Sequence, residues 1–139
     1  MEMENIKHTR PTESELTILN VLWDIGPSTV REVQHVLNKT KKTGYTTVLK
    51  LLQIMTEKKL VKRDESNHAH IYMPNCSKQQ TRRHLVDDLI KKAFGGSPVL
   101  LANTLFKEEA LSQSEFEKLR NEIIALRKKE SDHDNDAFN

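Results

Sequence analysis

Thr46, Lys50 and Gln53 are hydrogen-bonding residues that recur at helical spacing in the middle of the chain. At about 100° per residue they share one face of a helix, and the apolar residues Val48 and Leu52 fall on the other. A lysine ammonium donates to the acceptors of guanine, and a glutamine amide can pair with adenine. The pattern therefore predicts a helix that buries one side in a core and presents base-reading groups on the other.

The residues that lead into this helix are suited to phosphate. Lys42 carries a charge, Thr43 and Thr47 carry hydroxyls, and the amide groups at a helix start attract phosphate oxygens. Two alternatives stay open: Thr43 can simply cap the helix, and Tyr45 can pack inward and offer only its hydroxyl. The predicted DNA-binding residues are Arg10, Lys42, Thr43, Tyr45, Thr46, Thr47, Lys50, Gln53, Asn67 and His68.

The charge of the chain is concentrated around this helix. The formal net charge is only +2, but residues 38–63 hold eight Lys and Arg against the single acid Glu57. Residues 1–94 hold sixteen basic and eleven acidic residues, and residues 95–139 hold six and nine. A basic window on a nearly neutral protein is typical of a surface that binds a polyanion, although a solvated basic helix has the same composition.

The elements around the helix have the order of a winged helix-turn-helix. A capping box begins a first helix over about 12–25, which Gly26 and Pro27 end, and Ser28 can cap a second helix that runs to Leu37. The third helix spans about 45–59. Two short strands follow, at 60–64 and 69–73, with a turn at 65–68 between them. The predicted fold is mainly α with a small two-stranded antiparallel wing, and its third helix is placed to enter the major groove.

Three amphipathic segments follow the wing, at about 77–94, 98–106 and 112–129. Their apolar faces exceed what a short helix pair can hide, so we expect a two-fold dimer to cover them, the alternative being that they fold back onto a monomeric winged helix. The expected domains are a flexible segment 1–9, a DNA-binding domain 10–74, a helical dimerisation region 75–129 and a disordered tail 130–139. The predicted dimerisation residues are Leu85, Leu89, Ala93, Leu100, Leu101, Phe106, Phe116, Leu119, Ile123 and Leu126.

The chain carries no constellation that predicts catalysis. It has no Gly-rich phosphate loop, no GxSxG and no HExxH motif, so we expect neither an enzyme nor a cofactor. His68, His70, Cys76 and His84 lack the close paired spacing of a metal site. The polar N-terminus, the single cysteine and the short apolar runs predict a cytoplasmic protein that does not insert into a membrane.

Several runs of residues, taken together and in order, resemble the BlaI/MecI penicillinase-repressor family. They are LNVLW at 19–23, STVREV at 28–33, GYTTV at 44–48, EKKLV at 57–61 and KEEALS at 107–112, within a resemblance that covers about residues 10–127. The resemblance implies a homodimeric repressor of palindromic bacterial operators, often in antibiotic resistance or another stress response. In several members a membrane-bound metallopeptidase sensor leads to cleavage in the dimerisation region, which releases the operator.

The chain departs from the family pattern at the cleavage site. The penicillinase repressors are cut at an Asn-Phe bond in a short apolar helix, and no such bond exists in this sequence. The copper-responsive branch carries paired cysteines near its C-terminus, and these are also missing. The candidate cleavage region is therefore defined by its position alone: Leu101, Ala102, Asn103, Thr104, Leu105 and Phe106.

Two functions from different classes remain at this point. The first is a dimeric, sequence-specific transcriptional repressor of an operator, relieved by proteolysis in the C-terminal region. The second is a winged-helix protein-interaction module without specific DNA binding. The basic window and the polar face of the third helix favour the first.

Overall fold

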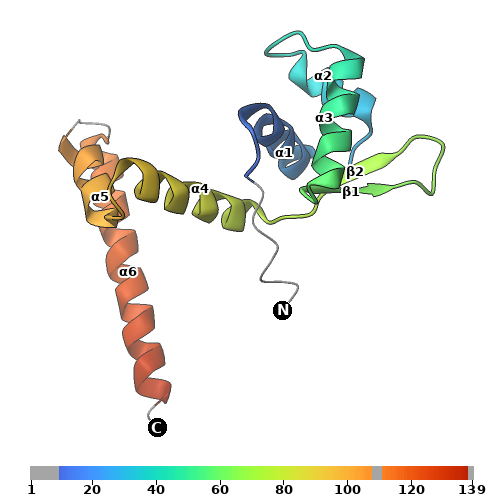
Figure 1. Ribbon diagram of the computed structural model, residues 1–139. Helices are drawn as coiled ribbons and strands as arrows, with labels where there is room; N and C mark the ends of the chain where they lie inside the picture. The colour runs from blue at the N-terminus through green and yellow to red at the C-terminus, as the bar shows by residue number, and fades with distance from the viewer. Residues whose placement is uncertain (1–9, 108–110, 138–139) are drawn as a thin grey trace. The chain divides into compact units, whose positions relative to one another are not determined.

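The computed structural model describes residues 10–107 and 111–137, the last five by their backbone alone (Figure 1). The predicted fold class, mainly α with a two-stranded antiparallel wing, is confirmed. The predicted flexible segment 1–9 lies outside the described residues. The elements are α1 (Glu13–Ile25), α2 (Val30–Leu37), α3 (Tyr45–Glu57), β1 (Val61–Asp64), β2 (Ile71–Pro74), α4 (Lys78–Ala93), α5 (Pro98–Lys107) and α6 (Gln113–Ala137).

Helices α1 and α2 both begin with a reciprocal capping box. The Thr12 hydroxyl accepts from the amide of Glu15 at 3.2 Å, and the Glu15 carboxylate accepts from the amide of Thr12 at 2.8 Å. Thr29 and Glu32 make the same pair of bonds at the start of α2. The expectation that Ser28 caps α2 is wrong, because the cap is the next residue.

Ser28 instead extends the wing. Its amide donates to the carbonyl of Tyr72 at 2.9 Å, and its carbonyl accepts from the amide of Tyr72 at 2.8 Å. This bridge lies beside the β1–β2 hairpin, which projects away from the helices in Figure 1. Lys59 lies between α3 and β1 and adopts a left-handed backbone conformation, with a φ of 63°. Its carbonyl accepts a hydrogen bond from the side-chain amide of Asn75, just after β2, at 2.9 Å. These contacts fix both ends of the hairpin to the helical domain.

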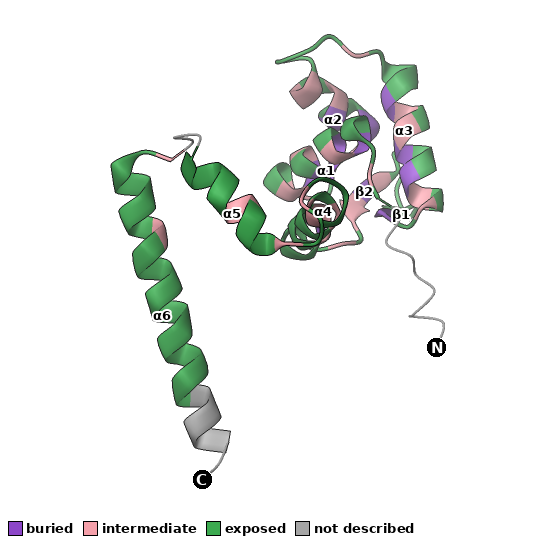
Figure 2. Cartoon of the chain, turned by 60° about the vertical axis from the view of Figure 1, so that its left-hand side comes forward, coloured by how far each residue is buried: buried purple, intermediate pink, exposed green. Residues whose placement is uncertain are grey.

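One apolar core joins the three N-terminal helices and the strands. Figure 2 shows that the buried residues gather in these elements, whereas the described residues of α5 and α6 are exposed or half-buried. The Trp23 indole closes the core by donating to the carbonyl of Cys76 at 3.1 Å. The core residues are Ile18, Leu19, Leu22, Val30, Val33, Val48, Leu52, Met55, Leu60, Val61 and Tyr72.

The chain divides into two compact units, residues 1–88 and 89–139. In the second unit the rings of Phe106 and Phe116 meet edge to face, with centroids 5.4 Å apart, and this contact joins α5 to α6. The predicted capping box at Ser112 and Glu115 is present. Within the described residues, none of the helices has both the length and the apolar character that a membrane span needs.

Helix α6 is longer than the sequence indicates. Its end was expected near Lys129, followed by a disordered tail over 130–139, but the helix continues to Ala137. Residues 138–139 lie outside the described part of the chain. Residues 130–137 include neither Gly nor Pro, so no strong helix breaker ends the element where its apolar stripe ends, although Ser, Asp and Asn in this stretch are poor helix formers.

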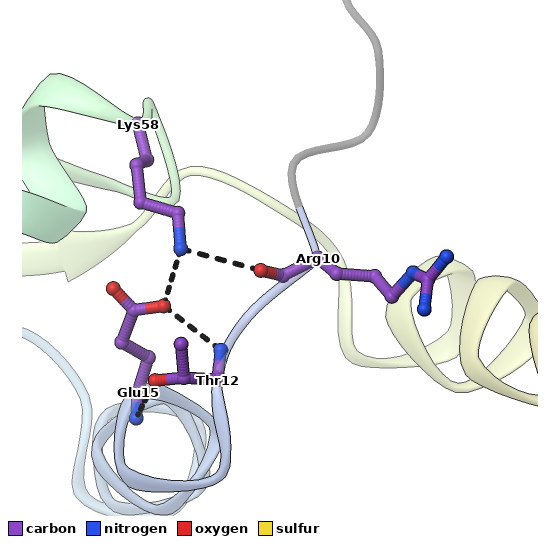
Figure 3. A network of polar contacts seen from close by, with 4 residues as sticks. All are labelled: Arg10, Thr12, Glu15 and Lys58. Atoms are coloured by element: carbon purple, nitrogen blue, oxygen red, sulfur yellow. Dashed lines mark hydrogen bonds and ion pairs between the residues drawn. The ribbon is translucent and has the colours of Figure 1, made fainter.

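A buried ion pair ties the start of α1 to the end of α3 (Figure 3). Glu15 is 2% exposed, and its carboxylate lies 2.5 Å from the ammonium of Lys58, which also donates to the carbonyl of Arg10 at 3.2 Å. Burial alone raises the pKa of Glu15, but the hydrogen bonds from Lys58 and Thr12 outweigh it and leave the pKa below its ordinary value of 4.5. The carboxylate is therefore held ionised.

Replacing Glu15 by Gln is expected to lower the free energy of unfolding by about 1–3 kcal/mol near neutral pH, because a charge-assisted bond is lost. The pKa of Glu15 is lower in the folded than in the unfolded protein, so its ionised carboxylate stabilises the fold at pH values above the unfolded-state pKa. This stabilisation is lost as the pH falls through the folded-state pKa. Wild type should thus lose more stability than the variant as the pH falls below 4.5. Urea unfolding across this range measures the difference.

The control for this prediction is Asp87→Asn, which removes the carboxylate of the exposed Arg83–Asp87 pair and should change stability little. Equal loss of stability on acidification in wild type and the Glu15 variant would contradict the assignment.

Candidate nucleic-acid interface

The outer face of α3 is built as the sequence predicts. Thr46, Lys50 and Gln53 are exposed, while Val48 and Leu52 on the opposite face are fully buried. The inward side is held by the core, so the outward side chains have a fixed platform. Thr47 is also exposed, and Tyr45 is 41% exposed, so Tyr45 does not pack into the core.

The N-terminus of α3 is open, unlike those of α1 and α2. Its cap is Gly44, which provides no side-chain hydrogen bond to the first turn. The Thr43 hydroxyl donates to the carbonyl of Lys41 at 3.0 Å, so Thr43 does not cap the helix. With no capping side chain and the positive end of the helix dipole, this end is suited to an anion such as phosphate.

The turn before α3 is braced by α2. Asn38 accepts the amide of Thr43 at 2.7 Å, and the Gln34 side chain donates to the carbonyl of Thr43 at 3.2 Å. These two bonds fix how the chain enters α3. They therefore fix where Lys42 and the first turn of α3 lie relative to the outer face.

Most of the basic residues in the 38–63 window are free to meet a polyanion. Lys58 is committed to Glu15, and Arg63 pairs with Glu65 in the wing. Within the part of the chain that the structure describes, the remaining basic residues of the window are exposed and form no ion pair. They are Lys39, Lys41, Lys42, Lys50, Lys59 and Lys62.

The other predicted DNA-binding residues lie apart from the start of α3. The Arg10 guanidinium pairs with Asp88 of α4 at 2.7 Å, and its carbonyl contacts Lys58 just beyond the C-terminal end of α3. Asn67 and His68 are exposed between β1 and β2. Nearby, hydrogen bonds from Ser66 lower the pKa of Asp64 below its ordinary value.

Sequence reasoning missed two residues at this surface. Arg31, in the first turn of α2, places its guanidinium carbon 5.2 Å from the centroid of the Tyr45 ring. Ile54 is an apolar residue of α3 that is 37% exposed. The only sequence signal for Arg31 is a weak one: it is a basic residue in the first turn of a helix, where the helix dipole disfavours a positive charge.

The predicted dimerisation residues lie on α4, α5 and α6, and most of them leave apolar surface uncovered. Leu85, Leu101 and Leu119 are half-buried and Ala93 is exposed. The larger side chains are 40–61% exposed: Leu89, Leu100, Phe106, Phe116, Ile123 and Leu126. The candidate cleavage residues, 101–106, all lie within α5 as helix.

The structure brings no chemically active cluster together in the described residues. No group of three or more His, Cys, Asp or Glu among them is placed to hold a metal ion. Cys76 is half-buried, with its sulfur 3.7 Å from the carbonyl of Leu60.

The chain is similar in sequence and in structure to known proteins. The family model described as penicillinase repressor matches residues 11–125. Proteins named transcriptional regulator BlaI, from two strains of Mycobacterium tuberculosis (CDC 1551 / Oshkosh and ATCC 25618 / H37Rv), are 30% identical over 121 residues, which cover 86% of this chain and 87% of theirs. A solution structure of monomeric Bacillus licheniformis BlaI with the blaP half-operator aligns at a TM-score of 0.43 and 22% identity, over 49% of this chain and 83% of that one.

Proposed function

The chain belongs to the penicillinase repressor family and is a DNA-binding transcriptional repressor, and we propose that it acts as a homodimer on a palindromic operator. In this proposal each α3 enters the major groove of one half-site, and the two wings lie along the backbone. The protein works in the cytoplasm, where its operator is, and carries out no catalysis of its own.

The observation that carries the proposal is the outer face of α3. Lys50 and Gln53 are exposed on a helix whose opposite face is packed in the core. The N-terminus of the same helix has no capping side chain and is suited to phosphate. Base-edge and backbone contacts are the two kinds that specific DNA recognition needs. A winged helix that binds only proteins has no need for this combination or for the exposed lysines around it.

Dimerisation is supported by the exposed apolar side chains of the second unit. On α6, Phe116, Leu119, Ile123 and Leu126 recur at alternating steps of three and four residues, which is the pattern of a helix that pairs with another helix. Ile123 and Leu126 are 46% and 61% exposed in the single chain. We propose that a second copy of the chain covers this stripe.

Release of the operator is proposed to follow from proteolysis in α5, triggered by a membrane-bound metallopeptidase sensor. A cut between residues 101 and 106 would separate α6 from the winged helix and remove the stripe that pairs the two copies. The two monomers would then lose the avidity that links their half-site contacts, of which each monomer makes only one. Because residues 101–106 are helical, α5 must unwind before a protease can cleave it.

A binding titration tests the proposed function. The full chain is mixed with genomic duplex fragments and with a scrambled duplex at several salt concentrations. Preferential binding that weakens steeply as salt rises is expected for a repressor that neutralises several phosphates. Binding that is absent or insensitive to salt would overturn the proposal and favour the protein-interaction module.

A further inference from the structure

Arg31 and Tyr45 form an exposed pair at the junction of α2 and α3. The guanidinium carbon of Arg31 lies 5.2 Å from the centroid of the Tyr45 ring, within range of a cation–π contact. Stacking on a ring orients a guanidinium while leaving its N–H groups free to donate. Both side chains remain accessible, since Arg31 is exposed and Tyr45 is 41% exposed.

The placement of Arg31 is electrostatically unfavourable in the free protein. It lies in the first turn of α2, where the partial positive charge of the helix end repels a cation. The adjacent Glu32 reduces this repulsion only in part, since its carboxylate is held at the cap by the amide of Thr29 and not beside the Arg31 guanidinium. In the described part of the chain, no carboxylate lies within ion-pair distance of Arg31. An oriented cation of this kind is suited to an anion from outside the chain.

The neighbouring groups define which anion fits. Tyr45 is the first residue of α3, and the N-terminus of this helix carries no capping side chain. The hydroxyl of Thr46 and the amides of the first turn are therefore next to Tyr45 in the chain. A guanidinium binds the oxygens of a phosphate through two parallel N–H bonds. Cationic and neutral donors thus come from two helices at one place beside the reading face.

We propose that Arg31, held in place by the Tyr45 ring, binds a single backbone phosphate of the operator and thereby sets the position of α3 in the groove. This inference rests on the proposed DNA-binding function and deepens it. Arg31 makes the phosphate contact and Tyr45 is a positioning residue for it. The contact carries no base information, so it should strengthen binding to every sequence and keep the reading face in register.

The test compares Arg31→Gln with wild type, both as full-length protein, on the preferred duplex and on a scrambled one. The variant loses one phosphate contact in each half-site of the dimer, which is expected to weaken binding about tenfold per half-site on both duplexes and to make the salt dependence shallower by about two units of log–log slope. Tyr45→Phe keeps the ring and should retain most of the affinity, whereas Tyr45→Leu removes the stack and should approach the Arg31 variant. Arg82→Gln on α4 is the matched control, because it removes an equal charge from an exposed site with no ion pair in the described residues.

Neutral methylphosphonate linkages placed one at a time in the duplex identify the phosphate. A neutral linkage at one position in each half-site should lower the affinity of the wild-type protein. The same linkage should not change the affinity of the Arg31→Gln variant. An unchanged salt slope in Arg31→Gln, or equal sensitivity of both proteins at every linkage, would overturn the inference while leaving DNA binding intact. Loss of thermal stability in the variant with unchanged affinity would make the pair a purely structural contact and would also overturn it. If the wild-type protein prefers no duplex over the scrambled one, the proposed function itself, sequence-specific binding to an operator, is contradicted.

Discussion

Replacing Ile123 by Asp is expected to raise the dissociation constant of the homodimer at least a hundredfold. Ile123 is 46% exposed in the single chain and lies in the middle of the apolar stripe of α6. In the proposed dimer the new carboxylate would be buried without a partner, which costs about 3 kcal/mol or more, and about 1.4 kcal/mol corresponds to a factor of ten in affinity. Sedimentation over a range of protein concentrations measures the dissociation constant.

The matched control is Asn121→Asp, which adds the same charge to α6 about 160° around the helix from Ile123. It should leave the dimer intact. Deletion of residues 97–139 should likewise give monomers and weaken operator binding, because the two half-site contacts are no longer linked. A truncated protein that stays fully dimeric, or equal behaviour of the two Asp variants, would show that α6 is not the interface.

Replacing Lys50 by Ala is expected to weaken binding to the preferred duplex by about 1–3 kcal/mol, or about 5- to 150-fold, for each half-site, and to relax the sequence preference at one base pair of each half-site. Lys50 is exposed at the centre of the outer face of α3, one turn from Thr46 and nearly one turn from Gln53. Its ammonium can donate to both acceptors of a guanine. Competition binding against duplexes that carry each base at each position measures the change in preference.

Gln53→Ala should behave in the same way at a neighbouring base pair, whereas Lys118→Ala on α6, an exposed lysine outside the reading face, should change neither affinity nor preference. Equal weakening of all sequences by Lys50→Ala would make Lys50 a phosphate contact. The assignment of base reading to this face would then be wrong.

The helices of the DNA-binding domain are predictable because their signals are local. The capping box at Thr12, the stop at Gly26 and the apolar period of α3 all lie within a few residues of the feature that they determine. The outward face of α3 follows directly from that period. Its prediction therefore needs no knowledge of how the helices pack.

The features that the sequence does not reveal depend on residues far apart in the chain. The Ser28 bridge needs Tyr72, and the Glu15 ion pair needs Lys58. Arg31 gains its orientation only when α2 folds against the start of α3, so neither its spacing nor its type identifies it. The continuation of α6 beyond Lys129 is not predictable from periodicity, because residues 130–136 carry no apolar side chain and most of them are weak helix formers.

The most direct test of the central claim is selection of bound duplexes from a random pool by the full-length protein. A homodimer that reads DNA through two copies of α3 should enrich a palindrome whose half-sites are centred about 10 base pairs apart, or a multiple of that spacing. Mutation of Lys50 should blur one position in each half-site symmetrically. A pool that shows no enrichment, or one that enriches a single unpaired half-site, would contradict the account.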